Sequence, residues 1–334
     1  MSPQFTPMVK RRENSGMRGI FLDMDTVSHQ GDVDLAPLRQ VLADLRTFGT
    51  TPAEHTASRI GDAEVVLVNK VKLTGTLLAR VTRLRLVCLA ATGTDNLDLE
   101  AARGRGIAVC NVPAYSALSV AQHVFALILV LNQHLKEYEA LLRQGAWRQA
   151  PQFTLLDHPL RELDGRSLGI LGYGDIGRAV AKIAAAFGMR VLIAARDAQD
   201  SRPGRLPLSE LLSQADVLSL HLPLTAETRG VIGTRELALM KRDALLINTA
   251  RGGLVDEQAL ADALRTGKLG GAGVDVLSEE PPVRGNPLLA PDIPNLIVTP
   301  HIAWATREAR QRVINEMAAN IAAFQKDGKR NRVV

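Results

Sequence analysis

The chain of 334 residues contains little cysteine and no long apolar run. Its two cysteines, Cys88 and Cys110, lie in apolar segments typical of strands, which favours reduced core thiols over a disulfide or a metal pair. The longest apolar run, residues 124–131, is too short to span a bilayer. The polar residues 1–16 lack the apolar core of a secretory signal and predict a disordered extension. We therefore expect a cytoplasmic protein with no membrane partner.

Two further classes of chemistry have no support in the sequence. The G-x-S-x-G turn of serine hydrolases is absent, and the histidines show no metal-ligand spacing, so we expect no metal site. The net charge of +5 is the small difference between 40 basic and 35 acidic residues. The basic clusters, residues 10–12 and 329–330, lie near the chain ends, which favours solvated tails over nucleic-acid binding. A mildly basic protein of this kind suits an anionic small molecule.

Apolar segments and helical patterns alternate along two stretches of the chain, which predicts an α/β fold with two parallel sheets. The first stretch predicts strands at residues 19–23, 65–68, 86–91 and 107–110, with helices at 35–48, 75–83 and 98–103. A long helical pattern at 118–143 and an irregular segment at 145–165 follow. The second stretch predicts strands at 167–171, 190–195, 217–220, 244–248, 271–276 and 296–299. The last helix, 306–325, has no sheet partner of its own, and we expect it to return to the first block.

A glycine-rich turn, Gly172-Tyr-Gly-Asp-Ile-Gly177, follows an apolar strand and opens a helix that Gly188 ends. This strand–turn–helix context is typical of a dinucleotide-binding site. Gly172 permits the tight turn, Gly174 lets the backbone approach a pyrophosphate, and Gly177 lets the helix pack on the strand. The free N–H groups of the helix then face the anion. The turn therefore predicts an NAD(P)-binding domain.

The next strand should end in an acid that binds the adenosine ribose, but it ends in Ala195 followed by Arg196. An arginine there can bind a 2′-phosphate, so we prefer NADP as cofactor and keep NAD as possible. Arg202 and Arg205 follow closely and can add positive charge. The rival interpretation makes Asp197 the ribose acid.

Three more strand ends carry side chains suited to one reaction. Arg251 follows the strand at 244–248, and its planar fork can bind the carboxylate and carbonyl of a 2-keto acid. His301 follows the last strand and can exchange a proton with the substrate oxygen near neutral pH. A carboxylate would orient that imidazole, and we choose Glu280, with Glu279 as the adjacent rival. Because the carboxyl ends of parallel strands carry the ligand, these groups are expected beside the dinucleotide.

Together these motifs resemble the D-isomer-specific 2-hydroxyacid dehydrogenases over nearly the whole chain from Met17. The resemblance implies that Arg251 anchors the substrate, that His301 is the acid/base, and that Glu280 is its partner. It implies a flavodoxin-like substrate domain from residues 17–112 and 302–334, with a Rossmann NAD(P)-binding domain, 113–301, inserted between its two parts. The segment after Val112 is similar to the dimerisation arm of that family, which implies a homodimer.

The expected binding residues complete this site. Cofactor contacts are expected from Gly172, Tyr173, Gly174, Asp175, Ile176, Gly177, Arg196, His221, Pro223, Thr249, Ala250 and Asp275. Substrate contacts are expected from Asn69, Lys70, Thr92, Gly93, Arg251 and His301.

Several stretches resemble the glycerate dehydrogenase/hydroxypyruvate reductase branch: residues 68–70, 91–96, 119–123, 145–147 and 301–304. The branch implies reversible reduction of hydroxypyruvate or glyoxylate to the D-2-hydroxy acid. Glu280 disfavours the formate dehydrogenase branch, which carries Gln there. No regulatory domain follows the last helix, which disfavours assignment to the serine-pathway phosphoglycerate dehydrogenases. The loop at 91–93 departs from the usual Gly-Val-Gly, so a dehydrogenase of a larger 2-hydroxy acid remains an alternative. A second alternative is a dinucleotide-sensing corepressor without enzymatic turnover.

Overall fold

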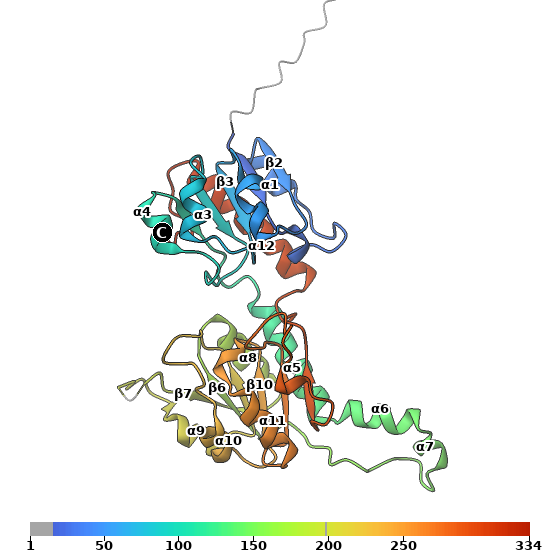
Figure 1. Cartoon of the computed structure of the whole chain (residues 1–334). Helices are drawn as coiled ribbons and strands as arrows, with labels where there is room; N and C mark the ends of the chain where they lie inside the picture. Colours follow the sequence, from blue (N-terminus) through green and yellow to red (C-terminus); the bar gives the residue numbers. More distant parts are fainter. Residues whose placement is uncertain (1–15, 198) are drawn as a thin grey trace, which may run out of the picture. The chain divides into compact units, whose positions relative to one another are not determined.

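The computed structural model describes residues 16–197 and 199–334, so the expected extension over 1–16 lies outside the described residues except for Gly16. The chain forms two compact units, each built on one parallel sheet (Figure 1). The terminal unit, which contains both chain ends, takes the chain up to Tyr115 together with Arg307–Val334. The inserted unit takes Ser116–Thr306. The chain thus passes between the units twice, a few residues beyond the breaks expected after residues 112 and 301.

The terminal unit is a five-stranded sheet in the order β2-β1-β3-β4-β5, with every neighbouring pair parallel. This order is that of flavodoxin-like folds. Its strands are β1 (Arg18–Phe21), β2 (Asp44–Thr47), β3 (Val65–Val68), β4 (Leu86–Leu89) and β5 (Ala108–Cys110). Its helices are η1 (Met24–Thr26), α1 (Ala36–Val41), η2 (Ala53–His55), α2 (Thr56–Ile60), α3 (Gly75–Arg80), α4 (Leu99–Gly104) and α12 (Arg307–Phe324).

Helices cover both faces of this sheet. On one face α1 and α12 pack through residues such as Leu38, Val313 and Met317, all fully buried. On the other face α2, α3 and α4 contribute Ile60, Leu78 and Ala102. The last helix therefore completes a core whose strands come from the first third of the chain, because α12 packs beside α1 on this face.

The inserted unit is a seven-stranded sheet in the order β12-β11-β10-β9-β6-β7-β8, again with parallel neighbours. Its strands are β6 (Ser167–Leu171), β7 (Arg190–Ala194), β8 (Arg205–Leu206), β9 (Val217–Leu220), β10 (Leu245–Asn248), β11 (Gly271–Val274) and β12 (Leu296–Val298). Its helices are α5 (Ala117–Asn132), α6 (Leu135–Arg143), α7 (Ala146–Gln149), α8 (Asp175–Ala186), α9 (Leu208–Gln214), α10 (Thr234–Leu239), η3 (Gly252–Leu254), α11 (Glu257–Arg265) and η4 (Pro287–Leu289).

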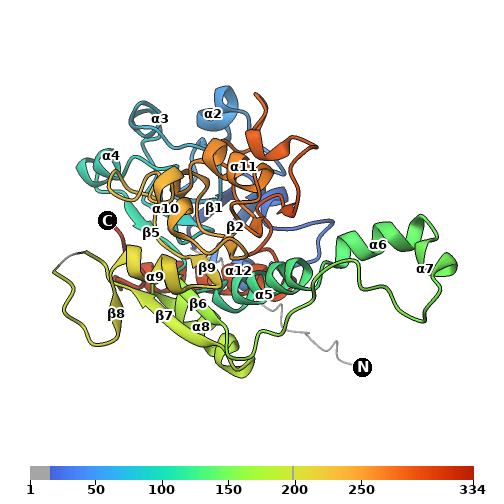
Figure 2. The same cartoon turned by 90° about the horizontal axis from the view of Figure 1, so that it is seen from below.

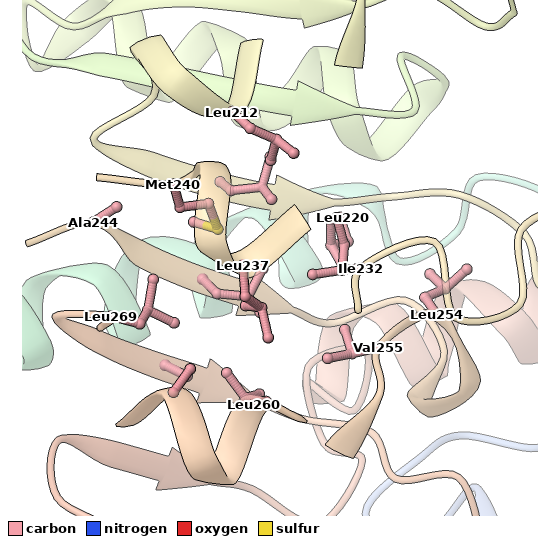
Figure 3. Packing of buried hydrophobic residues seen from close by; sticks show 14 of the residues in the cluster. Leu212, Leu220, Ile232, Leu237, Met240, Ala244, Leu254, Val255, Leu260 and Leu269 are labelled. Carbon is pink, nitrogen blue, oxygen red and sulfur yellow. The ribbon is translucent and has the colours of Figure 1, made fainter. Parts of the chain in front are cut away.

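Two buried clusters sandwich this second sheet. One cluster joins the sheet to α9, α10 and α11 through Leu212, Leu237 and Leu260 (Figure 3). The other joins it to α5 and α8 through residues such as Val124 and Val180. Both units are therefore doubly wound α/β folds, as the alternation predicts.

Helices α6 and α7 extend away from the seven-stranded sheet (Figure 2). None of the residues of α6 or α7 is buried. Among the described helices no single one is both long and apolar enough to cross a membrane, and only α5 and α6 together, bent by 53°, pass a test of length and composition.

Three local features differ from the sequence prediction. The helix expected over 35–48 ends at Val41, and β2 follows it as an edge strand with a mostly exposed Asp-Leu-Arg-Thr sequence. Such a strand lacks the apolar alternation that marks a half-buried strand. The two-residue edge strand β8 was not expected. The helix expected over 118–143 breaks at His134, which adopts a left-handed backbone with φ of 47°.

Candidate active site

The glycine-rich turn lies where the strand order of the inserted unit reverses. The chain leaves β6 toward β7 on one side and later returns to β9 on the other, which makes the carboxyl ends of β6 and β9 a switch point for ligand binding. At this point the His221 N–H donates to the Leu171 carbonyl at 2.7 Å. Gly172 has a φ of +100°, and a Cβ there would lie 2.6 Å from the His221 carbonyl carbon. Only glycine fits this approach of two backbones.

The other two glycines of the turn differ in what surrounds them. A Cβ on Gly177 would lie 2.3 Å from the Gly172 carbonyl oxygen, so close packing of the turn on α8 requires glycine. A Cβ on Gly174 would meet no described atom within 4 Å. Gly174 is the N-cap of α8, whose first N–H groups have no partner within the helix. The open space at this N-terminus fits a pyrophosphate.

Two buried polar atoms near the same edge lack a partner among the described residues: His221 Nδ1 and Thr249 Oγ1. These residues directly follow β9 and β10, which are neighbouring parallel strands. His221 Nε2 and Ser219 Oγ are 2.9 Å apart, and burial lowers the pKa of His221 to about 4. The imidazole is therefore neutral near pH 7. Because buried polar groups rarely stay unpaired, the two atoms fit contacts with a bound polar ligand.

Cationic side chains gather beyond β7, which ends at Ala194, one residue before the predicted end. Arg196 is exposed, and its backbone N–H donates to Asp200 at 2.8 Å. Arg202 donates to the same carboxylate through Nε at 2.7 Å and Nη2 at 2.6 Å. Hydrogen bonds from Arg202 hold the pKa of Asp200 far below its usual range. The Arg205 guanidinium lies 5.1 Å from the Tyr173 ring centre, against the glycine-rich turn.

His301 and Glu280 form the candidate acid/base pair. The His301 Nδ1 and Glu280 Oε2 atoms are 2.5 Å apart. The Leu277 N–H donates to the other oxygen, Oε1, at 2.9 Å and fixes the carboxylate. The rival Glu279 instead binds Arg284 at 2.8 Å. Because an ionised carboxylate only accepts, Nδ1 carries the proton of this bond, and Nε2 is the ring nitrogen that the predicted acid/base role would use.

The loop that carries Arg251 is shaped by Asn248 at the end of β10. Asn248 Nδ2 donates to the Arg251 carbonyl at 2.9 Å, and its Oδ1 accepts the Ala250 N–H at 3.1 Å. Gly252 then passes so close to the next loop that a Cβ would lie 2.0 Å from the Leu277 carbonyl carbon. The Arg251 loop and the Leu277–Glu280 loop are thus packed backbone to backbone.

Asp275 is 1% exposed and anchors the His301 loop by accepting hydrogen bonds from its backbone. Its Oδ1 accepts the Ile302 N–H at 2.9 Å, and its Oδ2 accepts the Ala303 N–H at 2.8 Å. Its carbonyl accepts the His301 N–H at 2.8 Å. The expected cofactor contact of Asp275 stays a prediction, whereas its contacts with the loop after β12 are direct.

The expected substrate residues of the terminal unit lie at the carboxyl edge of its own sheet. Asn69 and Lys70 follow β3, and their N–H groups donate to the buried carboxylate of Asp23 at 2.9 and 2.5 Å. Thr92, which precedes Gly93 in the loop after β4, donates its hydroxyl to the Val112 carbonyl at 2.8 Å. Sequence reasoning missed Asp23, because its partners lie 46 to 48 residues away and leave no local pattern.

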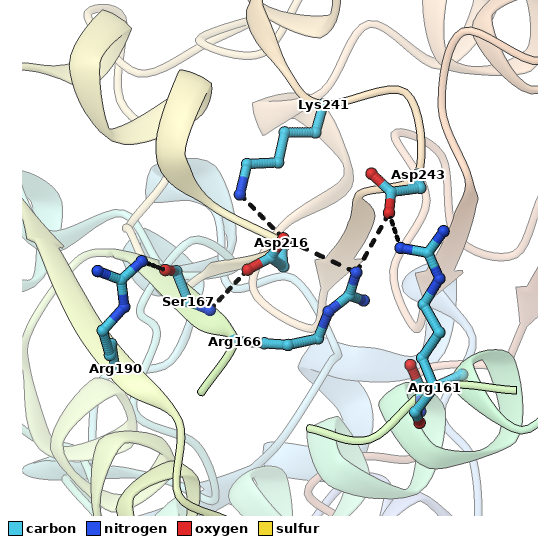
Figure 4. Close-up of polar contacts among 8 residues, drawn as sticks. Arg161, Arg166, Ser167, Arg190, Asp216, Lys241 and Asp243 are labelled. Atoms are coloured by element: carbon cyan, nitrogen blue, oxygen red, sulfur yellow. Dashed lines mark hydrogen bonds and ion pairs between the residues drawn. The ribbon is translucent and has the colours of Figure 1, made fainter. Parts of the chain in front are cut away.

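A second polar region lies at the opposite, amino edge of the seven-stranded sheet (Figure 4). A cavity of 660 Å³ there is lined by Arg161, Arg166 and Asp243, among others. Asp243 accepts from both of those arginines, and Asp216 accepts from Lys241 at 2.9 Å. These pairs tie the starts of neighbouring strands together, so we do not assign the substrate to this cavity. Among the described residues, no group of three His, Cys, Asp or Glu is arranged to hold a metal ion.

Comparisons with known proteins agree with this geometry. The sequence profile described as "D-isomer specific 2-hydroxyacid dehydrogenase, NAD binding domain" matches residues 125–303. Glycerate dehydrogenase of Methylorubrum extorquens is 44% identical over 82% of this chain and 87% of its own length. Hydroxypyruvate reductase of Blautia hydrogenotrophica is 40% identical over 89% of this chain and 93% of its own length.

Solved structures are similar over the same length. The NADPH-dependent glyoxylate/hydroxypyruvate reductase of Sinorhizobium meliloti, in complex with NADP and malonate, superposes with a TM-score of 0.76. It is 29% identical and covers 94% of this chain and 95% of its own. The dinucleotide turn, the His301–Glu280 pair and these relatives lead to one conclusion: the chain belongs to the D-isomer-specific 2-hydroxyacid dehydrogenases, which are NAD(P)-dependent oxidoreductases.

Proposed function

We propose that this enzyme reduces hydroxypyruvate or glyoxylate to the D-2-hydroxy acid and catalyses the reverse reaction. The observation that carries the proposal is the 2.5 Å contact between His301 Nδ1 and Glu280 Oε2 at the carboxyl edge of the sheet that also carries the glycine-rich turn. The names of the relatives support the substrate class, since they include a glycerate dehydrogenase, a hydroxypyruvate reductase and a glyoxylate/hydroxypyruvate reductase.

The proposed chemistry divides among three side chains. A bound reduced nicotinamide supplies the hydride to the 2-carbon. Arg251 binds the carboxylate and holds the carbonyl in place through its planar fork. His301 gives a proton from Nε2 to the carbonyl oxygen and recovers it in the oxidative direction. Glu280 keeps the ring oriented and stabilises the imidazolium, because an adjacent negative charge favours the charged form.

A panel of 2-keto acids of increasing size, followed by loss of reduced-nicotinamide absorbance, tests the proposal. We expect the highest kcat/KM with hydroxypyruvate or glyoxylate. A higher value with a branched keto acid would favour a dehydrogenase of larger substrates. Tight dinucleotide binding without turnover of any keto acid would favour the corepressor-like alternative.

We further propose that NADPH is preferred over NADH. Ala195 cannot accept hydrogen bonds from ribose hydroxyls with its side chain, so NAD lacks an anchor there. The guanidinium of Arg196 is exposed and has no carboxylate partner among the described residues. Arg202 is held by Asp200, so its charge is already compensated. Arg196 is therefore the main candidate for the 2′-phosphate, with Arg205 beside Tyr173 as the second.

Replacement of Arg196 by Ala tests this preference. One charge-assisted hydrogen bond contributes about 1.5–3 kcal/mol, so the KM for NADPH should rise roughly 10- to 150-fold. The KM for NADH should hardly change. Arg235→Ala, which removes an exposed charge on α10, is the matched control. If wild-type kcat/KM is higher with NADH and Asp197→Asn lowers it, Asp197 is the ribose acid and the phosphate site is wrong.

We also propose a homodimer that uses residues 114 to about 150, with the terminal unit as substrate domain and the inserted unit as NAD(P)-binding domain. Large apolar side chains are exposed around α6 and α7, including Leu142 at 51%, Trp147 at 54% and Phe153 at 88%. Burying such groups favours association. Sedimentation equilibrium should give a dimer at micromolar concentration, and Leu142→Glu should shift it toward monomer. A stable wild-type monomer would contradict the proposal.

Free, buried cysteines support the predicted cytoplasmic location.

A further inference from the structure

His123 on α5 lies against the segment that carries His301, far from it in sequence. Its Nε2 is 3.0 Å from Thr299 Oγ1 and 3.6 Å from Asp275 Oδ1. One turn earlier on the same helix, Ser119 Oγ lies 2.6 Å from Thr306 Oγ1. Residues four apart share one face of a helix. The first turns of α5 therefore contact both ends of the 299–306 segment.

The direction of these hydrogen bonds follows from counting donors. Thr299 Oγ1 has one proton and lies 2.5 Å from Asp275 Oδ1. A carboxylate only accepts, so the threonine proton points to Asp275. The hydroxyl oxygen is then left to accept, and His123 Nε2 must carry the hydrogen that it accepts. The chain of donors runs from His123 to Thr299 to the buried carboxylate.

This series of hydrogen bonds from His123 through Thr299 to Asp275 matters because the His301 backbone is strained. Its φ of 55° is in the left-handed region. A residue other than glycine keeps this backbone conformation only if contacts with its surroundings stabilise it. The enforcing contacts are the Asp275 carbonyl, which accepts the His301 N–H, and the Asp275 carboxylate, which accepts the next two N–H groups. Thr299 is the side chain that connects this carboxylate to α5.

We propose that His123 is a positioning residue for the reaction: its Nε2–H holds Thr299 and, through Asp275, keeps His301 in the orientation that meets Glu280. The inference rests on the proposed acid/base role of His301. His123 does not touch the reacting atoms. Its loss should therefore loosen the placement of His301 and lower kcat, while the glycine-rich turn and its dinucleotide stay as they are.

Replacement of His123 by Leu and by Gln tests the donor. Leu removes it and leaves the partly buried Thr299 hydroxyl without its donor, so kcat should fall roughly 5- to 100-fold. The Kd for the dinucleotide and the KM for the keto acid should change less than threefold. Gln can present an N–H near the position of Nε2, so it should recover most of the lost kcat. Gln122→Leu, at an exposed neighbour on the same helix, is the matched control.

A second cycle tests the route through Thr299. Thr299→Val removes the hydroxyl, so adding His123→Leu to it should cause little further loss of kcat. Thr299→Ser keeps the hydroxyl and should stay active. Losses that multiply in the double variant, or kcat of His123→Leu within twofold of wild type, would overturn the proposal. His301→Asn is assayed in parallel: if it keeps full turnover, the acid/base assignment has failed instead.

Discussion

A buried aspartate follows a strand in each unit, Asp23 after β1 and Asp275 after β11, with 2% and 1% of their surfaces exposed. Each accepts backbone N–H groups from the loop that follows the neighbouring parallel strand. Asp23 accepts from Asn69, Lys70 and Val71 after β3. Asp275 accepts from Ile302 and Ala303 after β12. The two sheets therefore fix a candidate ligand loop in the same way.

The two loops differ in what they have to hold. The loop after β12 contains His301 with its left-handed backbone, and it has additional side-chain contacts from Thr299 to Asp275 and His123. A left-handed residue other than glycine costs of the order of 1–3 kcal/mol, which the added contacts can offset. The loop after β3 contains no residue with positive φ. The comparison teaches that the proposed catalytic loop needs more anchors than the proposed substrate loop.

The largest expected effect tests whether the loop held by Asp275 is the catalytic one. His301→Asn removes the titrating ring, so kcat should fall roughly 10²- to 10⁴-fold, the usual contribution of general acid–base catalysis. Dinucleotide binding, measured by nicotinamide fluorescence, should change little. His55→Asn, an exposed histidine of the terminal unit, serves as control. Unchanged turnover of His301→Asn would remove the functional distinction between the two loops.

The next effect concerns the loop held by Asp23. Asp23→Asn leaves one accepting oxygen for three N–H groups. Because charge-assisted hydrogen bonds contribute about 1.5–3 kcal/mol each, we expect the free energy of unfolding of the terminal unit to fall by about 3 kcal/mol. If Asn69 and Lys70 bind substrate, the KM for the keto acid should rise at least tenfold, with a smaller change in kcat. Asp25→Asn, an exposed carboxylate nearby, is the control.

The location of this damage can be measured. Trp147 and Trp304, the two tryptophans of the chain, both belong to the inserted unit, whereas far-UV circular dichroism follows both units. Asp23→Asn should lower the urea midpoint seen by circular dichroism and leave the tryptophan transition nearly unchanged. A KM equal to that of the wild type would show that the Asp23 loop does not contribute to substrate binding.

The parts of the molecule that sequence reasoning predicts well are those with local signals. The turn at 172–177 combines an apolar strand, three glycines and a helix within a few residues, and Gly172 and Gly177 lie so close to neighbouring backbone that only glycine fits. The edge strand β2 was missed because its exposed, polar residues lack any alternation. His123, Thr299 and Asp23 were missed as positioning groups, because hydrogen bonds across 176 or 46 residues depend on the folded chain.

The smallest expected effect is a pH dependence of stability that comes from His221 in the inserted unit. Burial lowers its pKa to about 4 from 6.5, so the unfolded chain takes up a proton before the native one does as the pH falls. Stability should therefore be retained above pH 6.5 and lost progressively between 6.5 and about 4. From about pH 7 to about pH 5.5 the difference is about 1 kcal/mol. The terminal unit has only exposed histidines among its described residues, His29 and His55. Urea unfolding followed by tryptophan fluorescence should show this loss in the wild type and a weaker one in His221→Asn. Equal pH dependence in both proteins would mean that burial does not lower the pKa of His221 in the native state.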